Sequence, residues 1–233
     1  MKKIYVTTSW DDGHKLDLKL GELLKKYRLT GTFYISLKNH EFHKSELLSS
    51  QEIKDLSKNY EIGAHTLTHP DLTKISVLQA KKEINQSRLY LEKIINKKIN
   101  SFCYPSGKFN PVIKKLIKKS GFKLARTTKR FMTDLDFDSF LLPTTVHAYT
   151  HLQDLFNVPV MISYKSIKWS VLAIKLFNKI LRSRGFFHLW GHSWEIEKYH
   201  DWDQLEEVFK LISSGKDIEY LSNFDLVQSI YGR

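Results

Sequence analysis

Short runs of apolar, β-branched and aromatic residues alternate along the chain with longer runs in which apolar residues recur every three or four positions. The short runs predict strands and the longer runs predict amphipathic helices. Strands are expected over residues 3–10, 31–36, 60–65, 99–105, 122–128 and 185–192. Because strands that alternate with helices form parallel sheets with helical crossovers, the pattern predicts an α/β fold.

Two helix starts carry clear capping signals, since Ser49 is followed by Glu52 and Ser76 by Gln79. Other helices are expected near residues 16–27, 110–121, 166–184 and from about 201. The rhythm loosens after Arg130 and then resumes. The chain has seven or so βα units and no internal repeat or linker, so we expect one domain over residues 1–233. This domain is expected to be a barrel or an incomplete barrel. The chemistry of such a fold lies at the carboxyl ends of its strands.

The composition is typical of a soluble globular protein, with 42% hydrophobic and 27% charged residues. A single cysteine, Cys103, excludes an intramolecular disulfide and a cysteine-based zinc cluster.

The N-terminal run enters a strand without an apolar signal segment, so we expect a cytoplasmic protein. The most apolar later stretch, residues 156–180, is broken by Pro159 and several lysines and falls short of a membrane span.

The formal net charge is +12, but the lysines are scattered over almost every predicted helix and no nucleic-acid-binding motif accompanies them. We therefore do not expect a nucleic-acid partner. A solvated basic surface is one interpretation, and attraction to anionic lipid or to a phosphorylated glycan carrier is another. The basic helix over residues 166–184 could likewise be an ordinary amphipathic helix or one that contacts a membrane surface.

The stretch "TTSWDDGHKL", residues 7–16, places Asp11 and Asp12 side by side at the end of the first strand. Asp-Asp-Gly is common in turns, where Gly13 would supply a positive φ. A bound cation is the alternative, because it would draw both carboxylates into one cavity. A second motif, "GAHTLTHPDL", spaces His65 and His69 by four residues, which on one helical turn or in a tight loop brings two imidazoles to the same side. They could be ordinary polar loop residues, but together with the aspartates they suit a metal site with open positions.

"SWDDG" and "HTLTH" resemble the first two motifs of the NodB-type polysaccharide deacetylases, carbohydrate esterase family 4, whose usual forms are T-F-D-D-G and H-[ST]-x-x-H. The resemblance extends from Thr7 to about His192. It implies a distorted, incomplete (β/α) barrel of about seven βα units and removal of acetyl groups from sugars with one divalent metal ion, usually Zn²⁺. Carried over by position, Asp11 would be the general base, and Asp12, His65 and His69 would bind the metal.

The third family motif, commonly R-x-P-[YF]-G, aligns with "CYPSG", residues 103–107. Cys103 stands at the arginine position and Ser106 at the aromatic position, where the family uses the backbone N–H to stabilise an oxyanion. In the family, the arginine of this motif orients the base aspartate. The resemblance therefore leaves Asp11 without that partner. Arg126 ends a neighbouring strand and could replace it, or could be an ordinary surface arginine. Ser106, Tyr104 and Trp190 are expected to contact the substrate.

The last motif, usually L-x-H, matches "HLWGHSWE", in which two histidines compete. His192 lies nearer the carboxyl end of the strand, so we expect it to be the general acid that protonates the leaving amine. His188 is expected to be a hydrogen-bonded core residue. Trp10, Trp190 and Trp194 would wall the pocket, although buried aromatic residues at strand ends usually belong to the core.

These features predict a metal-dependent hydrolase that removes acetyl groups from an N-acetylated sugar or polysaccharide. One alternative is a deacetylase or deformylase of a lipid- or nucleotide-linked sugar, which the basic charge and the missing signal segment would suit. Another is a pseudoenzyme that binds metal or glycan without turnover, which only the departures at Cys103 and Ser106 favour. In each case the expected partner is a carbohydrate.

Overall fold

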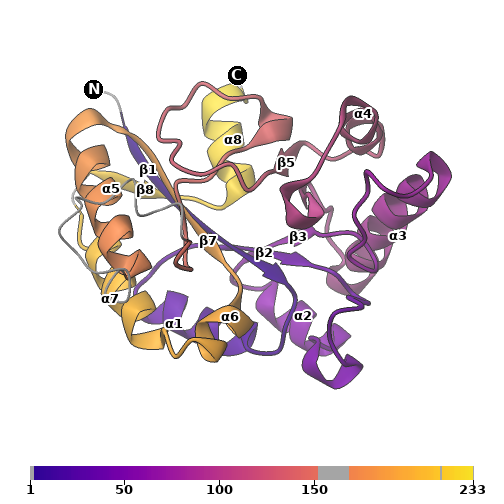
Figure 1. Ribbon diagram of the computed structural model, residues 1–233, viewed down its shortest axis with the longest axis horizontal. Coiled ribbons are helices and arrows are strands. Elements are labelled where there is room, and N and C mark those ends of the chain that lie inside the picture. The colour runs from indigo at the N-terminus through magenta and orange to yellow at the C-terminus, as the bar shows by residue number, and fades with distance from the viewer. Residues whose placement is uncertain (1–2, 152–167, 216, 233) are drawn as a thin grey trace.

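The computed structural model describes residues 3–151, 168–215 and 217–232. The strands lie at the centre of the molecule and the helices lie around them (Figure 1). Wherever two of these strands pair, they run parallel. The strands are β1 (Ile4–Asp12), β2 (Thr32–Ile35), β3 (Glu61–Ala64), β4 (Ser101–Cys103), β5 (Leu124–Arg126), β6 (Val146–His147), β7 (Gly185–Gly191) and β8 (Ile218–Tyr220).

Seven strands follow one path in the order β5-β4-β3-β2-β1-β7-β6. Strand β1 has β7 along one side and two successive neighbours along the other. Residues 4–6 of β1 pair with β8, and residues 9–12 pair with β2. The two ends of the path, β5 and β6, do not pair with each other in the described part of the chain, so the sheet curls without closing. The predicted distorted, incomplete (β/α) barrel is confirmed.

Both predicted capping boxes are present, at Ser49 and at Ser76. The predicted helices are also present, except that residues 166–167 of the basic one lie outside the described residues. Two short helices, α6 (Ser193–Lys198) and α8 (Asn223–Tyr231), and two short strands, β6 and β8, were not predicted. The helices are α1 (Asp17–Lys26), α2 (Ser50–Leu56), α3 (Val77–Ile95), α4 (Pro111–Lys119), α5 (Trp169–Ser183), α6 (Ser193–Lys198), α7 (Trp202–Ile212) and α8 (Asn223–Tyr231), with single 3₁₀ turns η1 (Lys44–Glu46), η2 (Pro105–Gly107) and η3 (Ser139–Leu141).

Helix α5 buries one apolar face against the barrel, including Trp169, Leu172, Phe177 and Ile180. It packs on α7 and β7 in the manner of an ordinary amphipathic helix. No helix among the described residues is both long enough and apolar enough to cross a bilayer. Part of the apolar stretch over residues 156–180, including Pro159, lies outside the described residues.

Candidate active site

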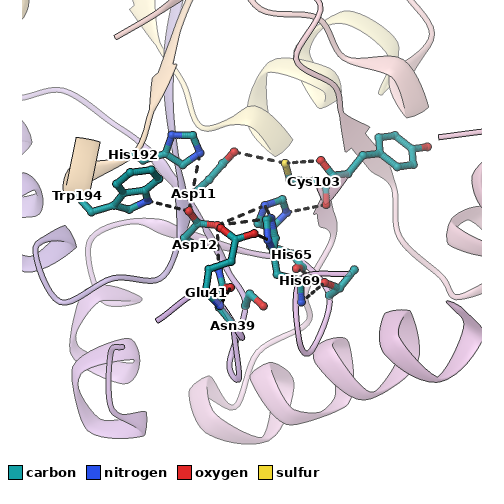
Figure 2. A network of polar contacts seen from close by, with 12 residues as sticks. Asp11, Asp12, Asn39, Glu41, His65, His69, Cys103, His192 and Trp194 are labelled. Carbon is teal, nitrogen blue, oxygen red and sulfur yellow. Dashed lines mark hydrogen bonds and ion pairs between the residues drawn. The ribbon is translucent and has the colours of Figure 1, made fainter. Parts of the chain in front are cut away.

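The polar residues singled out in the sequence meet at the carboxyl ends of the strands. Asp11 and Asp12 end β1, His65 follows β3, Arg126 ends β5 and His192 follows β7. Figure 2 shows the aspartates at the centre of a network of polar contacts, with His192 and Trp194 on one side and the histidine pair on the other. The parallel topology thus brings residues far apart in sequence to one rim of the barrel.

A change of backbone direction explains how β1 delivers two carboxylates to one place. Asp12 has a φ of 83° and Gly13 a φ of 74°, so the chain leaves the extended conformation at the last strand residue. Side chains therefore stop alternating there, and both carboxylates can face the same space. Asp12 is held by two donors, with Asn39 Nδ2 3.2 Å from its Oδ1 and Trp194 Nε1 2.9 Å from its Oδ2. A left-handed aspartate is uncommon, and such strained positions often occur at functional sites.

The loop after β3 is shaped to hold its second histidine. Thr66 and His69 both have positive φ, 64° and 63°, and the backbone N–H of His69 donates to Thr66 Oγ1 at 3.0 Å. The carboxylate of Glu83, on α3, accepts hydrogen bonds from the backbone N–H groups of Leu67 and Thr68, both at 2.9 Å. These contacts fix a tight loop rather than the helical turn that a spacing of four could also indicate.

Asp12, His65 and His69 converge as the ligands of a cation would. Asp12 Oδ1 lies 3.8 Å from His65 Nε2 and 3.6 Å from His69 Nε2, and the two nitrogens are 3.1 Å apart. His65 Nδ1 donates to the carbonyl oxygen of Cys103 at 2.9 Å, and His69 Nδ1 lies 3.0 Å from Glu41 Oε1. These bonds place the ring protons on Nδ1, so two nitrogen lone pairs and a carboxylate oxygen face one another.

A cation placed between these three atoms would remove the repulsion among the two lone pairs and the carboxylate oxygen. The three residues therefore fit a divalent metal ion. Burial, followed by the neighbouring His69, lowers the pKa of His65 to about 4. The ring is therefore neutral at physiological pH, which is the state that binds metal. The ligand set of one carboxylate and two imidazoles suits zinc and related transition metals.

The contact predicted between Asp11 and Arg126 is present. One guanidinium nitrogen of Arg126 donates to both carboxylate oxygens of Asp11, and both side chains are buried. Arg126 on β5 is the register partner of Cys103 on β4. The small Cys103 side chain, with its sulfur 3.7 Å from Asp11 Oδ2, leaves room for a guanidinium that comes from the next strand. Burial alone would raise the pKa of Asp11, but the charge and hydrogen bond of Arg126, together with His65 and His192, outweigh it and the pKa falls to about 2.

The segment aligned with the third motif departs from expectation at Tyr104. Its side chain is fully buried, packs against Phe102 and Phe109, and its hydroxyl donates to the carbonyl oxygen of Phe140 at 3.1 Å. In this position it belongs to the core and cannot contact a substrate. Ser106 instead lies at the surface in η2, with φ 52° and ψ 18°.

The two competing histidines have different surroundings. His188 is fully buried, with Nε2 2.8 Å from Ser9 Oγ and Nδ1 3.0 Å from the carbonyl oxygen of Pro143. His192 lies at the rim, with Nδ1 2.5 Å from Glu195 Oε2 and Nε2 3.9 Å from Asp12 Oδ2. Burial lowers the pKa of His192, but hydrogen bonding to Glu195 and the Asp12 charge more than compensate and raise it to about 9.

The three tryptophans lie at different depths. Trp194 contacts Asp12 directly, as described above. Trp190 is only 6% exposed and stacks on His147, so it offers little surface to a substrate. Trp10 is completely buried and packs edge-on against Phe209, which makes it a core residue.

Sequence reasoning missed several residues of the site, among them Asn39, Glu41, Glu83, His147 and Glu195. Asn39 and Glu41 follow β2 and His147 ends β6, so the rule that polar residues at strand ends form the site could have found them. Glu195 lies within the quoted "HSWE" segment, three residues after His192, a helical spacing that brings the two side chains together. Glu83 gives no local signal, because it reaches the site from α3 across the fold.

Comparison with known proteins places these residues in a family. The family model described as polysaccharide deacetylase matches residues 1–125. The matched part contains Asp11, Asp12, His65 and His69, and it ends just before Arg126. Peptidoglycan-N-acetylmuramic acid deacetylase PdaA of Bacillus subtilis is 32% identical over 126 residues, which cover 52% of this chain and 45% of PdaA.

A second relative is the poly-beta-1,6-N-acetyl-D-glucosamine N-deacetylase of Staphylococcus aureus, 32% identical over 119 residues that cover 44% of this chain and 41% of the relative. The matches thus span less than half the length of these curated relatives. A crystal structure of a proposed polysaccharide deacetylase from Mycobacterium smegmatis superimposes with a TM-score of 0.70 over 99% of this chain and 91% of that one; at 16% identity, it supports the fold alone. Since the family model covers more than half of the residues and includes both motifs, the chain belongs to the polysaccharide deacetylase family.

Proposed function

We propose that this protein is a metal-dependent hydrolase that removes acetyl groups from an N-acetylated sugar or polysaccharide. One observation carries the proposal. The buried carboxylate of Asp11 lies next to Asp12, His65 and His69, whose donor atoms are arranged as the ligands of one cation would be. Both curated relatives described above are named for deacetylation of N-acetylated glycans, which supports the same reaction class.

Asp12, His65 and His69 would hold one divalent ion, with Zn²⁺ the best match to the donor atoms. When bound, such an ion acts as a Lewis acid toward the acyl carbonyl and makes nearby water more acidic. The surrounding residues keep the ligands ready. Asn39 and Trp194 donate to the Asp12 carboxylate, and Glu41 and the Cys103 carbonyl orient the two imidazoles.

The remaining steps follow from the positions of the polar groups. Asp11, kept ionised and oriented by Arg126, accepts a proton from the attacking water as the new C–O bond forms. The backbone N–H of Ser106 would donate to the developing oxyanion, a role that does not depend on the serine side chain. His192 then donates its Nε2 proton to the sugar nitrogen as the C–N bond breaks, so acetate and a free amine leave. Glu195 orients His192 by accepting its Nδ1 proton in a hydrogen bond.

The alternatives differ in substrate or in activity. A lipid- or nucleotide-linked sugar would suit the net charge of +12, since such carriers bring phosphate groups. A pseudoenzyme would suit the departures at Cys103 and Ser106, but the Arg126 guanidinium occupies the place next to Asp11 that the substitution at Cys103 leaves open. The cytoplasmic location, contact with a membrane surface and the single-domain organisation stay predictions.

Acetate release from N-acetylglucosamine oligomers and from peptidoglycan fragments tests the proposal. Asp11→Asn should lower kcat/KM by about 10²- to 10⁴-fold, the usual contribution of a general base, while the protein keeps its metal. The matched control is Asp134→Asn, which removes an exposed carboxylate away from the rim. If the Asp11 variant instead loses the metal, the roles of the two aspartates are reversed.

A further inference from the structure

A second cluster of side chains that can bind metal lies beside the proposed active site and includes His192. His147 ends β6, His192 follows β7, and Glu195 lies in the first turn of α6. One donor atom from each residue lies within 4.8 Å of the other two. This set shares no residue with the three ligands proposed for the catalytic metal.

One ring nitrogen of His147 faces this cluster. Its ring is only 4% exposed, and Nδ1 lies 2.8 Å from His151 Nε2. The other nitrogen, Nε2, is 3.2 Å from Glu195 Oε2, yet it makes no hydrogen bond within the part of the chain that the structure describes. We assign the ring proton to Nδ1, where it is shared with His151. A buried lone pair then faces a carboxylate oxygen, an arrangement that a cation between the two atoms would stabilise.

The cluster is also held in place before any ion binds. The His147 ring stacks on Trp190 with centroids 3.8 Å apart and planes 6° from parallel. The two residues are register partners in β6 and β7, so the sheet itself fixes their contact. A metal-binding histidine commonly uses its second ring nitrogen in a hydrogen bond that fixes its tautomer, and His151 is placed to provide that bond.

We propose that His147 Nε2, His192 Nδ1 and Glu195 Oε2 bind a second Zn²⁺ and that this ion inhibits the enzyme. Two imidazoles and one carboxylate are a common ligand set for zinc. The ion replaces the proton that His192 Nδ1 shares with Glu195, and that proton leaves to solvent. With zinc on Nδ1, His192 keeps only its Nε2 proton, and release of that proton would leave an imidazolate instead of a neutral imidazole. His192 therefore becomes a much weaker acid toward the leaving amine. The inhibitory part of this inference rests on the proposed function, whereas the binding part does not.

Equilibrium dialysis of the full chain against excess free Zn²⁺ tests the binding part. Wild-type protein should bind two equivalents, and His69→Ala should keep only the one at the His147 cluster. His147→Gln should keep only the one at Asp12, His65 and His69. His200→Asn, which removes an exposed imidazole at a turn, is the matched control and should still bind two. Binding that stops at one equivalent in wild type, or a second equivalent that survives in His147→Gln, would overturn the proposal.

Acetate release at increasing zinc tests the inhibitory part. Wild-type activity should rise as the first equivalent binds and then fall by about tenfold or more, because loss of a general acid is worth at least that much. His147→Gln, measured against its own activity at one equivalent, should need about 10- to 100-fold more zinc for the same fall. A His147-dependent second equivalent in a protein without deacetylase activity would refute the proposed function alone. Deacetylase activity that excess zinc leaves unchanged would refute the inhibition alone.

Discussion

At the scale of single residues, Asp11 and Arg126 form an ion pair between two buried side chains. Both side chains are buried, and the guanidinium also lies 4.7 Å from the centre of the Trp190 ring. Arg126→Met should destabilise the fold by about 3–5 kcal/mol, because it leaves the Asp11 carboxylate buried without a counter-charge. Urea denaturation measures the loss.

A double variant separates this effect from simple loss of packing. Asp11→Asn combined with Arg126→Met removes both charges, so it should be more stable than Arg126→Met alone. Equal stabilities for the single and double variants would mean that the buried carboxylate is not what makes Arg126 necessary.

The two histidines of the last motif should respond differently to the same substitution. His192→Ala should abolish acetate release and leave the fold and the metal ion at Asp12, His65 and His69 intact, because His192 lies at the rim and is proposed to act as the acid. His188→Ala should instead cost about 1–3 kcal/mol, since it leaves Ser9 Oγ and the Pro143 carbonyl without their buried partner. Thermal unfolding together with an acetate assay distinguishes them. Wild-type turnover in His192→Ala would contradict the assignment.

Which site residues could be predicted depended on how local their signals are. Asp11, Asp12, His65 and His69 sit in two short motifs, and Arg126 was found because it ends a strand. The role of Cys103 could not be foreseen, since it depends on the register of β4 against β5, which brings Cys103 level with Arg126. Tyr104 was expected to contact the substrate, but its side chain is fully buried in the core.

At the scale of elements, length decides which helices and strands a sequence pattern reveals. Helix α3 has 19 residues and a capping box, so both its periodicity and its start are clear. Strand β6 has two residues and helix α6 has six, which is too short to establish a period. The left-handed backbone of Asp12, which decides how β1 presents its carboxylates, follows from the contacts of the fold and has no signal of its own.

Strand β3 begins with a half-buried carboxylate that joins four elements. Glu61 Oε2 accepts from Thr32 Oγ1 on β2 at 2.7 Å and from the backbone N–H of Phe224 on α8 at 3.1 Å, and Oε1 accepts from Ser101 on β4. Burial raises the pKa of Glu61 above its ordinary value of 4.5, and Asp225 adds to the shift against the hydrogen bonds that lower it. The folded protein therefore binds this proton more tightly than the unfolded chain does.

The sign of the resulting pH dependence is fixed. The stability that protonated Glu61 contributes is fully present below its unfolded pKa and is lost as pH rises through the raised folded pKa. The unfolding free energy of wild type minus that of Glu61→Gln should therefore fall as pH rises above about 4.5, by at most about 1.4 kcal/mol per pH unit. Urea denaturation at several pH values measures it. Glu207→Gln, an exposed control on α7, should show no such trend, and a difference that grows with pH would contradict this account.

At the scale of the whole molecule, one curled parallel sheet carries every residue of the proposed chemistry on a single rim. The alternation of strands and helices made this architecture predictable. The place where the barrel stays open, between β5 and β6, was not predictable, because β6 has only two residues and leaves no strand pattern in the sequence. The net charge of +12 adds an overall attraction for anionic substrates without placing any group at the site.

The central claim is that Asp12, His65 and His69 hold a divalent metal ion on which hydrolysis depends. The most direct measurement is acetate release from N-acetylglucosamine oligomers by chelator-stripped protein as Zn²⁺ is added back. We predict negligible activity in the stripped protein, recovery as the first equivalent binds, and no recovery in His69→Ala at the same metal concentration. Full activity in the stripped protein, or a His69→Ala variant that recovers like wild type, would contradict the claim.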